Sequence, residues 1–146
     1  MKYFLLAFTS LLLAAADSSA CSFPISTLDQ QVERADEIFI ATLVEAKVIP
    51  KSERTEWPYI EGRFETKRVL KGREQPKIIT LTTGLGRGDC GIGMSVSYKY
   101  VIFKGTKDTG IDDPSGTQLI EDFQEEELSA KIQAAVRRQR NMQKQK

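Results

Sequence analysis

A two-residue alternation runs from Glu37 to Ile49 and constrains the fold more than any other feature of the chain. Residues at every second position from Ile38 to Val48 share one face, and Phe39, Ala41 and Leu43 lie on the other. This period is that of a β-strand, whose successive side chains point to opposite faces of a sheet. The segment is therefore predicted to be a long strand that is buried on both faces where it begins.

Weaker patterns predict the rest of a mainly β domain. Further strands are expected at residues 59–70, 77–83, 96–104 and 117–120, and the short connections favour antiparallel pairing. The capping-box spacing of Thr27 and Gln30 predicts a short helix before the first strand. Five strands with one helix before them and one after indicate a small closed or nearly closed barrel.

The last segment, residues 122–146, has a helical period instead. Asp122 and Glu125 have the spacing of a capping box, and an apolar stripe follows at Leu128, Ile132, Ala135 and Val136. Acidic residues in the first turn and basic residues in the last suit the helix dipole. The basic end, from Arg137 to Lys146, could contact an anionic surface, but we expect it to be a frayed and solvated tail.

The first twenty residues have the composition of an export signal. A charged start precedes an apolar run too short to span a bilayer comfortably, and small residues follow at Ser18 and Ala20. Cleavage after Ala20 would expose Cys21 and leave a mature chain, extracellular or periplasmic, without a transmembrane segment. The alternatives are a retained anchor and a lipid on Cys21, although Ser18 is not the Leu-like residue of a lipobox.

Export also bears on the oxidation state of the cysteines. Cys21 and Cys90 are the two cysteines of the chain, and a disulfide between them would persist in an oxidising compartment. The bridge would close a loop of about 70 residues, for which the chain-entropy model gives roughly 4 kcal/mol of stabilisation.

Composition excludes several classes of function. The absence of histidine removes Ser-His-Asp and Cys-His hydrolases and His-ligated zinc sites, and two cysteines are too few for a Cys-rich metal centre. Lys plus Arg is 21 and Asp plus Glu is 20, so no nucleic-acid partner is expected. Acidic pairs such as Asp36–Glu37 and Asp112–Asp113 are interpreted as solvated surface charge. An enzyme that uses carboxylates alone remains an alternative, but no site motif indicates one. We expect a protein that is not an enzyme and has no cofactor and no metal of its own.

Two motifs in the glycine-rich segment 84–93 have an ordinary structural interpretation. Gly86, Gly88 and Gly91 match the G-x-G-x-x-G spacing, but no helix is expected after them to receive a pyrophosphate. Tight turns and the close approach of two segments explain the glycines better. The Arg87-Gly88-Asp89 tripeptide matches an integrin adhesion motif, yet strings of three residues recur by chance.

The order of motifs over residues 21–104 resembles the N-terminal domain of the tissue inhibitors of metalloproteinases. It is also similar to the wider netrin-like group, which includes single-domain bacterial relatives. The motifs are the cysteine at position 21, Ala35-Asp36-Glu37-Ile38-Phe39-Ile40-Ala41, Phe64 to Gly72, Asp89-Cys90-Gly91 and Tyr98 to Phe103. The resemblance implies a five-stranded OB-fold (netrin-like) barrel at residues 21–121, followed by the C-terminal helix and basic tail at 122–146.

The resemblance also implies a mode of action. In that family the α-amino group and carbonyl oxygen of the N-terminal cysteine chelate the zinc of a target protease, which assigns this role to Cys21. The residues implied to contact the protease are Ser22, Phe23, Pro24, Gly88, Asp89 and Cys90. The expected partner is a zinc metalloprotease, bound by a secreted monomer. The alternative is a non-inhibitory module that holds a protein or polysaccharide on the barrel face or on the 84–93 loop.

Overall fold

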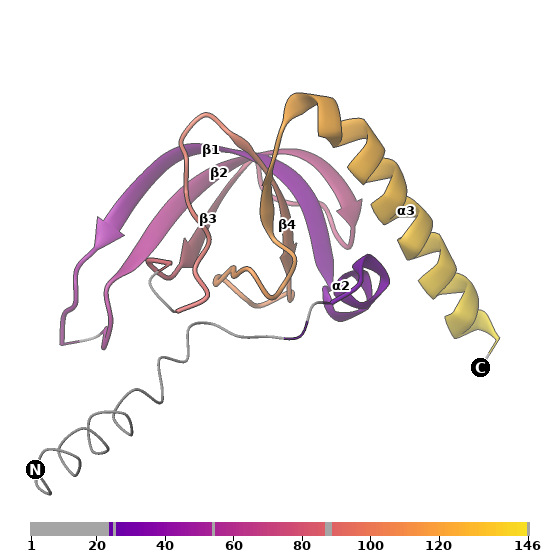
Figure 1. The fold of residues 1–146 in the computed structure, drawn as a ribbon, viewed down its shortest axis with the longest axis horizontal. Coiled ribbons are helices and arrows are strands. Elements are labelled where there is room, and N and C mark those ends of the chain that lie inside the picture. The colour runs from indigo at the N-terminus through magenta and orange to yellow at the C-terminus, as the bar shows by residue number, and fades with distance from the viewer. Residues whose placement is uncertain (1–23, 25, 54, 87–88, 146) are drawn as a thin grey trace, which may run out of the picture.

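The computed structural model of the protein describes residues 24, 26–53, 55–86 and 89–145. Over these residues the protein is mainly β, with five antiparallel strands in one sheet and two helices (Figure 1). Helix α2 (Leu28–Arg34) precedes strands β1 (Glu37–Ile49) and β2 (Tyr59–Lys71). Strands β3 (Ile78–Thr83), β4 (Lys99–Lys104) and β5 (Gln118–Ile120) follow, and helix α3 (Asp122–Lys144) comes last.

The sheet is arched and has the strand order β3-β2-β1-β4-β5 (Figure 1). The register of β1 against β2 shifts at three places between Ile38 and Glu45, and such irregularities bend a strand and increase its twist. Beyond β4, an isolated parallel bridge joins Gly110 to Thr82 of β3. This arrangement is consistent with a small barrel-like fold and confirms the expected mainly β class with flanking helices.

The alternation along β1 directs its side chains into two separate apolar clusters. Ile38 and Ile40 pack with residues of α2 and α3 on one face of the sheet. Phe39, Ala41 and Leu43 pack on the other face with residues of β2, β3 and β4. The expected burial of both faces in the first half of β1 is thereby confirmed.

Two lysines attach the helices to the sheet. Nζ of Lys71, at the end of β2, donates hydrogen bonds of 2.7 Å to the carbonyl oxygens of Val32 and Ala35 at the end of α2. Nζ of Lys99, at the start of β4, forms ion pairs with Asp122 at 2.9 Å and Glu125 at 2.6 Å in the first turn of α3. No helix in the described ranges combines the length and apolar character needed to cross a membrane.

Three expectations about local structure are wrong. The strand expected from Val96 begins at Lys99, because Val96 and Ser97 form a turn in which Ser97 has a φ of 75°. The N-cap of α3 is Glu121, whose amide donates to the side chain of Gln124, one residue before the expected pair. The basic end is helical as far as Lys144 rather than frayed.

Glu37 also departs from its expected place on the surface. Its side chain accepts hydrogen bonds from Nζ of Lys104 at 2.9 Å and Nε of Arg73 at 2.7 Å, and the residue is 1% exposed. Burial acts to raise the pKa of Glu37, but the two cations outweigh it and the pKa lies below its usual value. Asp36 does lie on the surface, where its carboxylate accepts from the amide and hydroxyl of Thr106.

Candidate functional site

The expected protease-contacting surface is described in part. Pro24 is exposed and precedes α2, and Asp89 and Cys90 lie in the glycine-rich loop between β3 and β4. The expected site residues outside the described ones are Cys21, Ser22, Phe23 and Gly88. The leader at residues 1–20 also lies outside the described residues. The part of the expected site whose geometry is described is the glycine-rich loop, with Pro24.

Asp89 organises the glycine-rich loop from within. Its carboxylate accepts hydrogen bonds from the amides of Leu85 at 2.6 Å, Gly86 at 2.8 Å and Gly91 at 3.1 Å. Burial acts to raise the pKa of Asp89, but these amides outweigh it and lower the pKa below its usual value. A carboxylate engaged by three amides of its own loop has a structural role, which favours chance as the origin of the adhesion-like tripeptide.

The two arms of the loop approach each other too closely for side chains. A Cβ atom on Gly91 would lie 2.3 Å from the carbonyl oxygen of Gly84, and one on Gly84 would lie 2.3 Å from Oδ2 of Asp89. Gly86 has a φ of 74°, in the left-handed region that glycine adopts without strain. The interpretation of these glycines as residues of close approach and tight turning is confirmed.

Cys90 is held in an uncommon backbone conformation. Its φ is 57°, a value that non-glycine residues rarely adopt, and its carbonyl oxygen accepts a 3.1 Å hydrogen bond from the amide of Asp113. The thiol of Cys90 is not free. Its expected partner, Cys21, lies outside the described residues, so the Cys21–Cys90 pairing stays a prediction.

The second half of the loop, residues 91–95, forms hydrogen bonds to buried residues of β3 and β4. The amide of Ile92 donates a 3.0 Å hydrogen bond to the buried hydroxyl of Thr83, and the side chain of Ile92 packs in the apolar cluster that contains Phe39 and Leu43. The hydroxyl of Tyr100 donates to the carbonyl oxygen of Gly93 and accepts from the amide of Ser95. Cys90 is therefore carried on a loop that is bonded to β3, to β4 and to the segment around Asp113.

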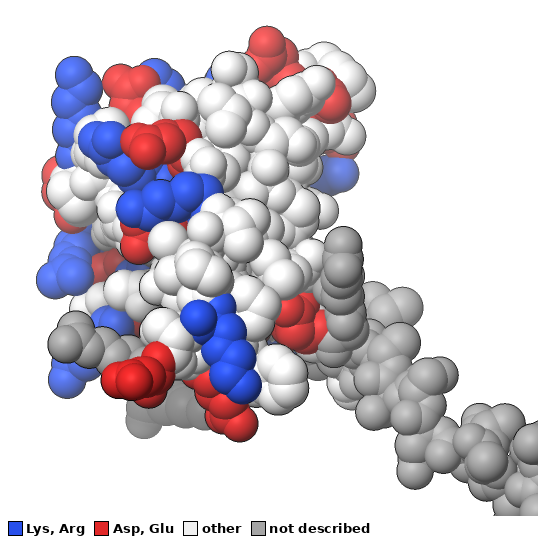
Figure 2. Space-filling model, turned by 90° about the vertical axis from the view of Figure 1, so that its left-hand side faces the viewer, with Lys and Arg blue, Asp and Glu red and all other residues white. Residues whose placement is uncertain are grey.

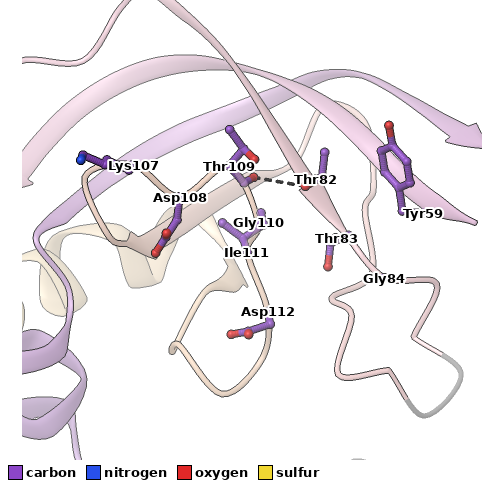
Figure 3. A pocket seen from close by; sticks show the side chains of 10 residues that line it. All are labelled: Tyr59, Thr82, Thr83, Gly84, Lys107, Asp108, Thr109, Gly110, Ile111 and Asp112. Carbon is purple, nitrogen blue, oxygen red and sulfur yellow. Dashed lines mark hydrogen bonds between the residues drawn. The ribbon is translucent and has the colours of Figure 1, made fainter. Parts of the chain in front are cut away.

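An open hollow of about 640 Å³ lies beside the loop (Figure 3). Tyr59, Thr82, Thr83 and Gly84 line one side, and residues 107–112 line the other. The amide of Thr82 donates 2.8 Å to the carbonyl oxygen of Thr109, which joins the two walls. Hydroxyl, ammonium and carboxylate groups at its rim suit a polar ligand. Across the described ranges, no three His, Cys, Asp or Glu side chains are grouped to hold a metal ion.

Charges of both signs are mixed at the hairpin end of β1 and β2. Lys47 pairs with Glu61 at 2.7 Å and Arg63 with Glu45 at 2.8 Å. Figure 2, which views the molecule from this side, shows basic and acidic side chains next to each other rather than one continuous basic area.

The contacts that fix the loop could not be read from the sequence. Thr83 and Tyr100 fit a strand pattern equally well with or without a hydrogen bond to the loop, and Asp113 contributes a backbone amide that has no sequence signal. The hollow was likewise missed, since its walls come from segments more than 20 residues apart. The density of glycine in residues 84–93 was the signal that did locate the loop.

Comparisons with known proteins assign the chain to no family. No model of a protein family matches it, and no curated protein matches it significantly.

Proposed function

We propose that the protein is a secreted inhibitor of a zinc metalloendopeptidase that acts through its processed N-terminus. The α-amino group and carbonyl oxygen of Cys21 chelate the zinc ion of the protease. Ser22 enters the specificity pocket, and Phe23 and Pro24 continue along the cleft. The observation that supports this proposal is the set of hydrogen bonds that connects residues 89–93 to residues 85–86, to β3, to β4 and to Asp113.

The chemistry of the chelate is sound. An amine and a carbonyl oxygen of one residue form a five-membered ring with zinc, and a catalytic zinc keeps an exchangeable position for such ligands. An α-amino group has a pKa of about 7.7–8.0 in model compounds, so an unprotonated fraction is present near neutral pH. The zinc belongs to the protease, and the inhibitor supplies no metal.

The loop contributes rigidity to this mechanism. Three amides bind the carboxylate of Asp89, the amide of Asp113 holds the carbonyl oxygen of Cys90, and Thr83 anchors Ile92. A disulfide from Cys90 to Cys21 would transfer that rigidity to the chelating amine. Groups that are ordered before binding lose less conformational entropy on association. Asp89 and Cys90, with Gly88, would form the ridge beside the cleft.

The decisive experiment moves the amine by one residue. Processed protein is assayed against a panel of zinc endopeptidases, next to a form with one alanine added before Cys21 and a control with one alanine added after Lys146. We expect the N-terminal extension to abolish inhibition and the C-terminal extension to leave it unchanged. Equal inhibition by all three forms would contradict the chelate. Mass spectrometry of the N-terminus first establishes whether Cys21 carries a free amine, a lipid or the leader.

A second candidate function is a binding module without inhibitory activity, and the hollow beside the loop favours it. Its rim offers the Tyr59 ring, the Thr82 hydroxyl and the Lys107 ammonium group to a polar polysaccharide or peptide. Under this proposal Lys107→Ala weakens binding of the partner, whereas the alanine added before Cys21 does not. The two functions are thus separated by the same extended protein.

A further inference from the structure

Helix α3 presents a stripe of side chains to solvent on the face opposite its buried residues. The buried face consists of Ser129, Ile132, Ala135 and Val136. The outward stripe recurs in steps of four and three residues, which keeps it on one side of a helix. Its members are Phe123, Glu127, Ala130, Ala134, Arg137 and Asn141, of which Ala134 is half-buried and the others are exposed. In Figure 1 the helix runs along the edge of the molecule.

The stripe begins with an apolar side chain and has two small side chains at its centre. Acidic residues lie on one side of that centre and basic residues on the other. Phe123 is 82% exposed, although burying an aromatic ring of this size is strongly favourable. Ala130 and Ala134 at the centre would allow another helix to approach closely. Glu126 and Glu127 lie before the centre, and Arg137 and Arg138 lie after it.

We propose that this face of α3 binds the same face of a second copy of the chain, as an antiparallel pair of helices. With the two-fold axis level with residue 132, Glu126 and Glu127 lie at the level of Arg137 and Arg138 of the second copy. Because flanking residues on the same side of the helix meet in such a pair, Glu126 lies toward Arg137 and Glu127 toward Arg138. Ala130 lies opposite Ala134, and Phe123 packs beside Asn141. The symmetry repeats each contact, so both acidic halves meet basic halves.

The charge pattern selects this occupant and this orientation. A parallel pair would place Glu127 on Glu127 and Arg137 on Arg137, and like charges across an interface are repelled. Three of these residues already form ion pairs within the chain: Glu126 with Arg68, Glu127 with Lys131 and Arg138 with Asp29. Because the side chains of Glu126, Glu127 and Arg138 are largely exposed, the second copy can share them without breaking these pairs. In the described residues Arg137 forms no ion pair of its own. This proposal replaces the monomer expected from the sequence, and it does not depend on Cys21.

The dimer is expected to be weak and sensitive to salt. Exposed ion pairs contribute little each, and salt screens them, so the contact relies on Phe123 and on the close approach at the alanines. Sedimentation velocity of the processed full-length protein, from about 1 to about 200 µM, should show a reversible dimer in the range of transient interfaces. A monomer over the whole range would overturn the proposal.

Charge reversal tests the geometry. E126R/E127R and R137E/R138E should each be monomeric alone, an equimolar mixture of the two should form a heterodimer, and the fourfold variant should regain the homodimer. The matched control E53R/E74R makes the same change of net charge as E126R/E127R, on exposed residues away from α3, and should dimerise as the unmodified protein does. A dimer that survives both reversals would place the interface elsewhere and refute the proposal. So would a monomer whose Arg137 and Arg138 are needed instead for binding to anionic lipid vesicles.

Discussion

Glu37 and Lys104 are register partners across the β1–β4 ladder, and their side chains meet in a buried ion pair of 2.9 Å. Arg73 completes the group from the turn after β2, so one carboxylate connects three separate parts of the chain. Removing water from these charges is costly, and the contacts among them compensate for that cost only while every partner is present.

Glu37→Gln is therefore expected to destabilise the protein by about 3 kcal/mol, because it leaves the ammonium group of Lys104 buried without its counter-charge. Urea denaturation monitored by circular dichroism measures the change. The matched control is Glu61→Gln, which breaks the more exposed pair with Lys47 and should cost less than about 1 kcal/mol. Equal losses in both variants would show that the buried group has no special importance.

Stability should fall in acid through Asp89. Its pKa is lowered in the folded protein, since the loop amides outweigh burial. A carboxyl with a lowered folded pKa stabilises the fold above its unfolded pKa, about 3.9, and loses that contribution as pH falls through the folded value. Asp89→Asn should therefore lower the free energy of unfolding at neutral pH, and the difference should shrink in strong acid. A difference independent of pH would rule out this origin.

Gly91→Ala should disrupt the loop that carries Cys90. The new Cβ atom would lie 2.3 Å from the carbonyl oxygen of Gly84, so the backbone must move, at a cost of about 1–3 kcal/mol. Gly93→Ala is the control, because nothing lies within 4 Å of the Cβ position there. Thermal denaturation measures both. The prediction is wrong if the two alanines have the same effect.

Lys71→Met should loosen α2 by removing the two hydrogen bonds to its terminal carbonyl groups. We expect a loss of about 1–2 kcal/mol, since a lost hydrogen bond to a charged group is only partly replaced by water. Lys77→Met changes an exposed lysine just before β3 and serves as the control. Amide hydrogen exchange in α2 should rise in Lys71→Met alone; unchanged exchange would mean that the helix is held by its apolar contacts.

The sequence predicted most where a repeated pattern could be followed. The bounds of β1 agree with the structure at both ends because its alternation is unbroken from Glu37 to Ile49. β4 was extended too far, because the left-handed backbone at Ser97 leaves the apolar pattern of Val96 and Tyr98 intact.

Contacts between distant segments were beyond this kind of reasoning. Burial of Glu37 depends on Lys104, 67 residues away. In the candidate site, glycine density predicted the close approach of Gly84 and Gly91. The three hydrogen bonds from loop amides to the carboxylate of Asp89 form only in the folded loop, so the sequence could not indicate them.

The parallel bridge from Thr82 to Gly110 has a consequence for local opening of the fold. Its two backbone hydrogen bonds join β3 to the chain beyond β4, whereas the other strands are joined by longer ladders. If the two backbone hydrogen bonds of this bridge broke transiently, the hollow would widen. The segment that contains Asp113 would then move, and the hydrogen bond from its amide to the carbonyl oxygen of Cys90 would weaken. A ligand that contacts both walls of the hollow would keep them together. Binding in the hollow should therefore make the loop around Cys90 more rigid, and loss of the ligand should make it less rigid.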